Sequence, residues 1–488
     1  MLFNSIEFAL FFPIVTFLFF ALPHRYRWLL LLLASCFFYM FFRPIYILIL
    51  FFTIVIDYYA GIWISNEADK KRKKWLLALS IVANVGVLVV FKYYNFLTDN
   101  FNFFLAATGS ETAIPYLDII LPIGLSFHTF QAMSYTIEVY RGNQKPEKHF
   151  GIYALYVMFY PQLVAGPIER PQNILHQFHE KKVFSYENMR VGFLLIAWGL
   201  FKKVVIADRL AQFTNQVYGS PEQYSGIPLI IGTVCFAFQI FCDFSGYSDI
   251  AIGSARCMGY DLMKNFDRPY LATTISEFWR RWHISLSTWF RDYLYIPLGG
   301  NRVSKPRMYL NLFIVFLLSG VWHGANWTFV IWGALHGVYL VVESEVYRRY
   351  PGLKAHTHWA GLFLSRSLVF LLVIVAWVFF RAKTVNDSFY IIAHMFSGLI
   401  DQISSLLHNV PYAKLELLYL GHSGIEFFGA MFLIGLLMTI HYLQGKKSFE
   451  DMVLSQPALR RWTVYYLLVI SVVFFGVFNR SEFIYFQF

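Results

Sequence analysis

A histidine between two apolar runs is the residue whose surroundings point most directly to chemistry. His323 lies in the segment SGVWHGANW, and apolar runs of helical length flank it from Met308 to Leu318 and from Thr328 to Val342. A histidine at membrane depth is costly unless it faces protein, water or a substrate path. A neutral imidazole can take a proton from a hydroxyl nucleophile and return it to a leaving group. We therefore expect His323 to be a general base; the alternative is a histidine that only hydrogen-bonds a neighbouring helix.

Small residues surround this histidine, and they would let another backbone or a ligand approach closely. They are Ser319, Gly320, Gly324 and Ala325. His336 follows within the next apolar run, and on a continuous helix its angular offset would turn it to a different face. A metal site shared by the two histidines is therefore not expected, and His336 is predicted to be structural.

A second histidine, His283, lies in the segment FWRRWHISLS. Aromatic and aliphatic residues recur there at three- and four-residue spacing from Ser276 to Leu294, which predicts a basic, tryptophan-rich amphipathic helix at the membrane surface. On the residues alone, His283 reads as an interfacial histidine. Arg280 and Arg281 could bind the phosphates of a cytoplasmic thioester cofactor, since guanidinium groups suit phosphate.

Two carboxylates, Asp243 and Asp249, bracket the segment FSGYS at the end of an apolar run. In a broken helix they could form the cation or proton site of a transporter. Capping a helix end or joining a hydrogen-bonding network is the favoured reading. No P-loop, dinucleotide fingerprint, HExxH or GxSxG motif occurs in the sequence, and its four cysteines have no metal-ligand spacing, so no metal site is predicted.

The composition defines the elements that must position these residues. The chain is 58% hydrophobic and 14% charged, with a mean hydropathy of +0.51, whereas soluble domains are about half apolar and a quarter charged. Repeated apolar runs of roughly 17 to 23 residues can each cross a bilayer core. The sequence predicts an all-α polytopic membrane protein, without the short alternating strands of a barrel. The net charge of +11 is scattered among the runs, which indicates cytoplasmic loops and no nucleic-acid partner.

Charged loops set the expected orientation. The basic run from Lys70 to Lys74 marks a cytoplasmic loop, so the N-terminus, and by later loops the C-terminus, is expected outside.

The proline-rich segment 160–171 predicts a broken, re-entrant element lining a cavity. Residues 1–488 are expected to form a single integral membrane domain. Besides the two runs around His323, the predicted spans are Ile6–Leu22, Trp28–Phe42, Ile45–Ile64, Trp75–Tyr94, Asp118–Tyr140, Val191–Ala207, Ile227–Cys242, Leu362–Phe380, Ile425–Leu443 and Thr463–Phe478.

Six ordered segments along the chain carry a specific resemblance. They are LPIGLSFHTFQ (121–131), QLVAGPIER (162–170), DFSGYSD (243–249), FWRRWHISLS (278–287), WHG (322–324) and EFIYFQF (482–488). Together they resemble the membrane-bound O-acyltransferase (MBOAT) superfamily, and within it the alginate O-acetyltransferase, or AlgI-type, branch. In one departure, His128 stands where this branch is expected to carry an aromatic residue, often tyrosine; it would either line the tunnel or be a neutral substitution.

The resemblance implies a ring of tilted transmembrane helices around a central tunnel, with re-entrant and surface amphipathic helices. It implies that His323 is the catalytic residue at mid-tunnel. A second polar residue, histidine or asparagine, is expected some tens of residues upstream, and His283 matches it. His323 would then take the proton while His283 orients or polarises, with Arg280 and Arg281 holding the donor.

The resemblance also implies an activity. An acyl group, usually acetyl, would pass from a cytoplasmic thioester such as acetyl-CoA, a substrate and not a bound cofactor, across the bacterial inner membrane. A periplasmic SGNH-type partner or acyl acceptor protein would receive it for O-acetylation of a polysaccharide such as alginate. Membrane lipid would surround this multi-pass chain.

Other functions remain open at this stage. Within the same class, the acceptor could be peptidoglycan, or the reaction could be D-alanyl transfer to teichoic acid. An ion-coupled transporter using Asp243 and Asp249 would tolerate the loss of His323. A non-catalytic scaffold would depend on no single histidine.

Overall fold

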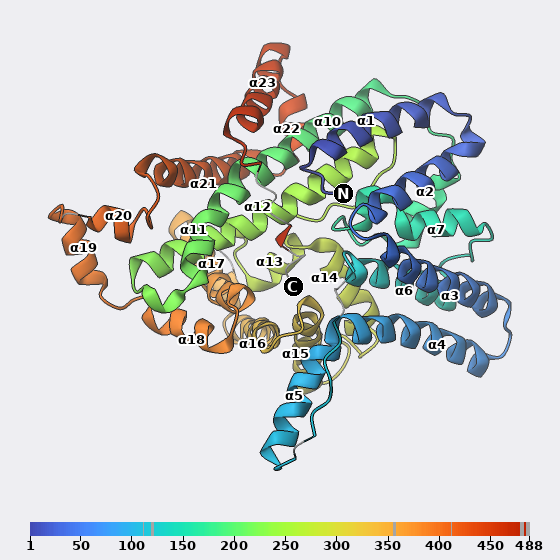
Figure 1. Ribbon diagram of the computed structural model, residues 1–488, viewed down its shortest axis with the longest axis horizontal. Helices are drawn as coiled ribbons and strands as arrows, with labels where there is room; N and C mark the ends of the chain where they lie inside the picture. Colours follow the sequence, from blue (N-terminus) through green and yellow to red (C-terminus); the bar gives the residue numbers. More distant parts are fainter. Residues whose placement is uncertain (111, 119–121, 355–357, 411, 479–482, 485–488) are drawn as a thin grey trace. The chain divides into compact units, whose positions relative to one another are not determined.

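The computed structural model describes residues 1–110, 112–118, 122–354, 358–410, 412–478 and 483–484 (Figure 1). Every regular element in these ranges is helical, which confirms the all-α class. The chain divides into two compact units, one of residues 1–196 and 247–264 and the other of residues 197–246 and 265–488. It passes from one unit to the other three times, within the helices α10 (Tyr186–Leu200) and α12 (Ile227–Cys257) and in the loop between residues 264 and 265.

The first unit is built on helices α3, α4 and α6, which pack against one another. Asp57 of α3 lies among them, where it accepts hydrogen bonds from Ser80 Oγ at 2.6 Å and Asn84 Nδ2 at 2.8 Å. Such polar contacts between apolar helices hold a bundle together in lipid. Besides parts of α10 and α12, its helices are α1 (Ile6–Ala21), α2 (His24–Met40), α3 (Ile47–Asn66), α4 (Lys70–Leu88), α5 (Tyr94–Ala107), α6 (Leu125–Arg141), α7 (Phe150–Met158), α8 (Tyr160–Leu163) and α9 (Pro171–Ile174).

The second unit holds both histidines of interest and most of the long C-terminal helices. Its helices, besides parts of α10 and α12, are α11 (Asp208–Gly219), α13 (Ile275–Arg281), α14 (Ile284–Phe290), α15 (Lys305–His323), α16 (Trp327–Arg349), α17 (Trp359–Arg381), α18 (Val385–His394), α19 (Leu399–Leu407), α20 (Ala413–Leu417), α21 (Gly424–Gln444), α22 (Phe449–Leu454) and α23 (Ala458–Phe475). A π-helical turn over Phe201–Ala207 connects α10 to α11.

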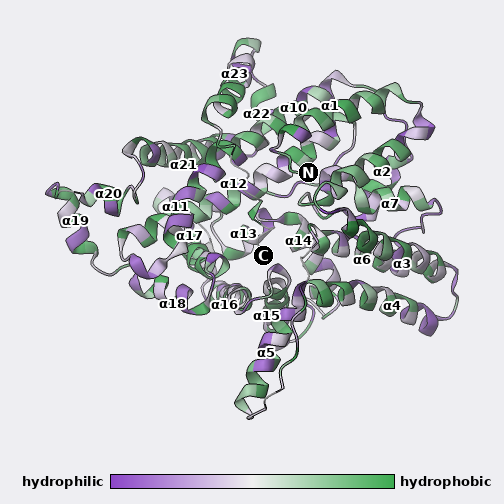
Figure 2. Cartoon of the chain, in the orientation of Figure 1, coloured by the Kyte–Doolittle hydropathy of each residue, from purple (hydrophilic) through white to green (hydrophobic). Residues whose placement is uncertain are grey.

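The apolar content of these helices makes the chain a multi-pass membrane protein. Among the described residues, seven helices are long and apolar enough to cross a membrane, or eight if the bent pair α18 and α19 forms one span. Figure 2 shows apolar residues along much of α3, α17 and α21. Large side chains such as Phe363 of α17 and Ile425 and Phe432 of α21 are exposed, as lipid-facing residues should be.

Basic residues lie at several helix ends of the second unit. α15 starts at Lys305, α16 ends at Arg349, and the loop after α21 carries Lys446 and Lys447, as is typical of cytoplasmic loops. The end of α17 is basic as well, with Arg381 and Lys383. The pair α18–α19 follows α17, and its two helices are bent by 60° against each other.

Candidate active site

The helices α15 and α16 form a hairpin whose backbones approach closely. A Cβ atom on Gly320 would lie 2.3 Å from the backbone oxygen of Phe329 and 3.0 Å from the Cα of Gly333. A Cβ atom on Gly333 would lie 2.4 Å from the backbone oxygen of Phe316. Glycine alone allows this approach at both crossing positions. The prediction that small residues beside His323 permit close packing is thereby confirmed.

The turn of this hairpin determines where His323 lies. His323 is the last residue of α15, and Gly324 after it is extended. Asn326 caps α16 by accepting the backbone N–H of Thr328 at 3.0 Å. The helix therefore ends at the histidine, and the imidazole lies at the break between α15 and α16.

The imidazole of His323 has a defined tautomer and an aromatic surround. Its Nδ1 lies 2.6 Å from the backbone oxygen of Ser319, and a carbonyl oxygen can only accept, so Nδ1 carries the proton. The rings of Trp332, Trp322 and Phe380 lie 4.7, 4.9 and 5.5 Å from the imidazole. Only 4% of His323 is exposed. Nε2 therefore bears the lone pair that a general base needs.

His283 lies at a second helix break. The single amphipathic surface helix predicted over 276–294 is instead two short helices, α13 and α14, followed by a π-helical turn. His283 stands between them with φ of 43°, a left-handed conformation that is rare outside glycine and clusters at functional sites. Trp282 and Leu286 are 1% exposed, so the apolar face of this segment packs inside protein and does not rest on the membrane surface.

Asn265 orients the buried imidazole of His283. The Oδ1 atom of Asn265 accepts the Oγ–H of Ser285 at 2.9 Å and its N–H at 3.3 Å, which identifies this atom as the oxygen. The same oxygen lies 3.1 Å from His283 Nδ1, so Nδ1 donates to it. Burial, followed by the charge of His323, lowers the pKa of His283 well below its usual value. His283 is thus neutral with its lone pair on Nε2.

Trp322 connects the two histidines. Its ring centroid lies 4.9 Å from that of His323 and 6.4 Å from that of His283. The structure thus brings both sequence-predicted histidines into one buried aromatic cluster, each with Nδ1 as donor and Nε2 as the atom that can accept a proton. Such a pair can take and hold a hydroxyl proton in a dry environment.

Two polar contacts from α16 hold the His283 segment in place. Trp279 Nε1 donates to His336 Nδ1 at 3.2 Å, so His336 has the structural role expected of it. The carboxylate of Glu343 accepts the backbone N–H groups of Ile275 and Ser276 at the first turn of α13. The hairpin that carries His323 therefore also anchors the helix before His283.

Comparison with known proteins identifies the class of this site. Residues 148–380 match the membrane-bound O-acyltransferase family, MBOAT. The probable alginate O-acetylase AlgI of Pseudomonas aeruginosa is 39% identical over 433 residues, covering 88% of this chain and 81% of that protein. The chain belongs to the membrane-bound O-acyltransferase family. The matched region contains His283 and His323.

Two further relatives are named for different acceptors. The probable alginate O-acetylase AlgI of Azotobacter vinelandii is 36% identical over the full length of both chains. The peptidoglycan O-acetyltransferase of Helicobacter pylori is 38% identical, covering 75% of this chain and 73% of that protein. The predicted resemblance is thereby confirmed, and the chain is an O-acyltransferase of this family.

The two arginines of the acyltransferase have different surroundings. Arg281 forms an ion pair with Glu277. Arg280 is exposed, and its Nε donates to the backbone oxygen of Ser276 at 3.1 Å. Arg280 is therefore the more accessible of the two for an anionic ligand, whereas Arg281 already has a carboxylate partner.

The two aspartates considered as a transporter site lie within the continuous helix α12, so the helix break that such a site would need is absent and neither carboxylate caps an end. Asp243 pairs with Lys203 at 2.7 Å, which is the network role favoured from the sequence. At 100° per residue, Asp249 points away from Asp243 by about 120°. Among the described residues, no group of three or more His, Cys, Asp or Glu could hold a metal ion.

The first unit of the acyltransferase contains the remaining sequence candidates. His128 is 1% exposed, and neither ring nitrogen has a hydrogen-bond partner among the described residues. The proline-rich segment 160–171 is broken, as predicted, into α8, a turn and the start of α9. Glu169 within it is fully buried and accepts the N–H of Met263 at 2.5 Å.

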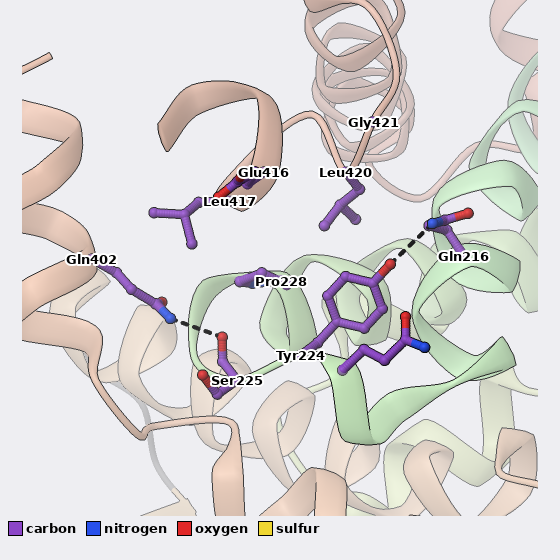
Figure 3. Close-up of a pocket in the computed structure, with 10 residues that line it drawn as sticks. Gln216, Tyr224, Ser225, Pro228, Gln402, Glu416, Leu417, Leu420 and Gly421 are labelled. Carbon is purple, nitrogen blue, oxygen red and sulfur yellow. Dashed lines mark hydrogen bonds between the residues drawn. The ribbon is translucent and has the colours of Figure 1, made fainter. Parts of the chain in front are cut away.

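A cavity of about 370 Å³ lies elsewhere in the second unit, between the α11–α12 loop and the segment α19–α20 (Figure 3). Gln216 donates to Tyr224 Oη at 3.0 Å and Gln402 donates to the backbone oxygen of Ser225 at 3.0 Å. None of the predicted site residues lines this cavity.

Sequence reasoning missed Asn265, Glu343 and Lys203. Asn265 lies in a loop, where no periodicity marks it as buried. Lys203 follows Lys202 within the predicted span Val191–Ala207, and nothing in the sequence names its carboxylate partners. A charged residue within a membrane span generally indicates a functional or paired group, so Lys203 could have been predicted to be such a residue.

Proposed function

We propose that this acyltransferase moves an acetyl group from a cytoplasmic thioester, such as acetyl-CoA, to a hydroxyl acceptor that enters from outside, for O-acetylation of an extracellular polysaccharide such as alginate. The observation that carries the proposal is the pair of buried histidines in one aromatic cluster, each with Nδ1 as donor and Nε2 as the atom that can accept a proton. Relatives named alginate O-acetylase match along most of the chain, which supports the acceptor class.

His323 is the base of the proposed reaction. Its Nε2 takes the proton of the acceptor hydroxyl, and the hydroxyl oxygen attacks the thioester carbonyl carbon. Collapse of the tetrahedral intermediate breaks the carbon–sulfur bond, and the imidazolium returns its proton to the departing thiolate. The Ser319 carbonyl holds the Nδ1 proton throughout, which keeps the ring oriented.

His283 orients the acceptor. Because its Nδ1 proton is donated to Asn265, its Nε2 can accept a hydroxyl proton but cannot donate to the thioester carbonyl. Orientation is thus the favoured one of the two roles expected from the sequence. Polarising the carbonyl would require a charged imidazole, which burial opposes.

The donor enters from the cytoplasmic side in this proposal. Arg280, exposed one helix turn before His283, would contact the donor phosphates, and Arg281 would contribute less because Glu277 neutralises it. The enzyme would lie in the bacterial inner membrane. Its partner would be a periplasmic SGNH-type transferase or another acyl acceptor protein that passes the acetyl group to the polymer.

A second acceptor, peptidoglycan, is favoured by one observation. The Helicobacter pylori relative named peptidoglycan O-acetyltransferase is as similar as those named alginate O-acetylase, although it covers less of this chain. Both acceptors use the same acetyl chemistry at the same pair of histidines.

Acetyl content of isolated polymers tests the proposal. Cells lacking the gene would be complemented with the wild type or with His323→Ala, with equal membrane levels verified. Wild type is expected to restore the O-acetyl groups of the exopolysaccharide, and His323→Ala is expected to restore none. Restoration of acetyl groups on peptidoglycan alone would identify the second acceptor. Full restoration by His323→Ala would refute the role of the histidine.

A further inference from the structure

Phe483 and Ile484 lie beside a buried carboxylate. They are 1% and 2% exposed. The backbone N–H of Ile484 donates to Asp243 Oδ2 at 2.7 Å. This bond joins residues 241 positions apart in the sequence, both within the second unit. These two residues are therefore packed into the second unit.

An ion pair fixes the carboxylate that makes this bond. Lys203 Nζ lies 2.7 Å from Asp243 Oδ1 and 2.8 Å from Asp208 Oδ1, with all three side chains at most 4% exposed. Two carboxylates around one ammonium group are costly to bury unless each has further donors. The N–H of Ile484 is such a donor for Asp243, and it binds the oxygen that Lys203 leaves available.

The residues that follow α23 already lie beside this ion pair. The backbone N–H of Val477 donates to the backbone oxygen of Val204, the neighbour of Lys203, at 2.8 Å. Arg209 donates to the backbone oxygen of Phe475 at 2.9 Å. The end of α23 therefore contacts the π-helical turn that carries Lys203.

Phe244 lies between this segment and the active site. The ring of Phe483 lies 5.6 Å from that of Phe244, and Phe244 packs edge-on against His283 at 4.6 Å. Asp243 is the neighbour of Phe244 on α12. The same short stretch of helix thus binds the C-terminal segment and contacts the histidine that orients the acceptor.

We propose that the Lys203–Asp243 pair is a positioning element that holds Phe483 and Ile484 beside His283 as a wall of the acceptor path. The role in catalysis rests on the proposed function. The anchoring itself is a property of the fold. Asp243 and Lys203 act through the segment and through Phe244, and they do not touch the reacting atoms.

Thiol labelling tests the anchoring without any activity measurement. Ile484→Cys keeps the backbone N–H. The purified variant would be treated with a maleimide and the rate of labelling at Cys measured, with the wild type as the blank for its four native cysteines. The rate is expected to be low in Ile484→Cys alone and with Asp208→Asn added. Asp243→Asn should raise it by about tenfold or more, because the charged acceptor of the N–H is lost. Equal rates in the two asparagine variants would overturn the anchoring.

Acetyl transfer tests the consequence for catalysis. Ile484→Pro removes the N–H donor, and Ile484→Ala keeps it. Ile484→Pro is expected to lower transfer as much as Asp243→Asn does, with the double variant no lower than either, and Ile484→Ala should retain more activity. Equal activity of the proline and alanine variants would overturn the role as a wall. If wild type transfers no acetyl group, the proposed function fails, while the labelling rates still decide the anchoring.

Discussion

His283 Nδ1 lies 3.1 Å from the side-chain oxygen of Asn265, which also accepts two hydrogen bonds from Ser285. The asparagine therefore fixes both the ring orientation and the tautomer of His283. Residues that hold a functional histidine in this way are often nearly as important for activity as the histidine itself.

Asn265→Asp should change the pH dependence of the acyltransferase. A carboxylate beside Nδ1 favours the imidazolium form of His283, which raises its pKa and removes the Nε2 acceptor at acidic pH. The acidic limb of the kcat profile should move to higher pH, whereas Asn265→Ala should lower kcat by about 10- to 100-fold with little shift of the limb. Steady-state acetyl transfer measured from pH 5 to 9 checks this. Identical profiles for the wild type and the aspartate variant would contradict the assigned orientation.

Replacement of His323 should abolish most of the catalysis. General base catalysis contributes about 10²- to 10⁴-fold, so His323→Gln should lose that factor in kcat while donor binding changes little. The control is His176→Gln, since His176 is 60% exposed and belongs to neither helix break. Initial rates with purified enzyme and acetyl-CoA would measure both. A His323→Gln rate within a factor of three of the wild type would exclude the base role.

The surroundings of His323 could be predicted from the sequence better than those of His283. The helix-length apolar runs predicted α15 and α16, and the glycines beside His323 predicted their close packing, because both depend on local composition. The break at His283 could not be predicted, since Ser276 to Leu294 has uniform helical periodicity and its two halves separate only through long-range contacts with Asn265 and Glu343. A left-handed histidine leaves no signal in a single sequence.

The membrane organisation was predicted in the same uneven way. Runs such as Leu362–Phe380 and Ile425–Leu443 match α17 and α21 closely because apolar length alone defines a span. α12 continues well past the predicted end at Cys242, because Lys203 neutralises the buried charge of Asp243. Pairing between distant charges lies outside what hydropathy can detect.

Arg280 and Arg281 should differ in donor recognition. Arg280→Ala is expected to raise the KM for acetyl-CoA several-fold, because an exposed guanidinium is lost from the cytoplasmic approach to His283. Arg281→Ala should raise it less, since Glu277 already neutralises that charge. The KM for acetyl-CoA would be measured for both alanine variants and for Arg280→Lys, which keeps the positive charge. A larger effect at Arg281 would place the donor differently.

Trp279 and His336 should be coupled in stability. Trp279→Phe removes the Nε1 donor and leaves His336 Nδ1 buried without it, at a cost of about 1–3 kcal/mol. His336→Phe removes the acceptor and leaves the indole N–H buried. The double replacement should cost less than the sum of the two single ones, which a thermal double-mutant cycle in detergent would detect. Simple additivity would show that the contact contributes nothing.

The fully buried Glu169 should make the stability of the first unit depend on pH. Burial is the largest influence on this carboxyl and raises its pKa from 4.5 to about 7, against the opposing hydrogen bonds from Asn173 and Met263. A raised pKa in the folded state favours the protonated form. Its contribution to stability is therefore complete below pH 4.5 and is lost as the pH rises through 7.

Glu169→Gln isolates this contribution, since glutamine has nearly the same shape and does not titrate. The difference in Tm between wild type and variant, measured in detergent from pH 4.5 to 8, should move against the wild type as the pH rises. The corresponding free energy is of order 3 kcal/mol. Subtracting the variant cancels every other titrating group, so a Tm difference that stays constant across this range would mean that Glu169 does not change protonation there.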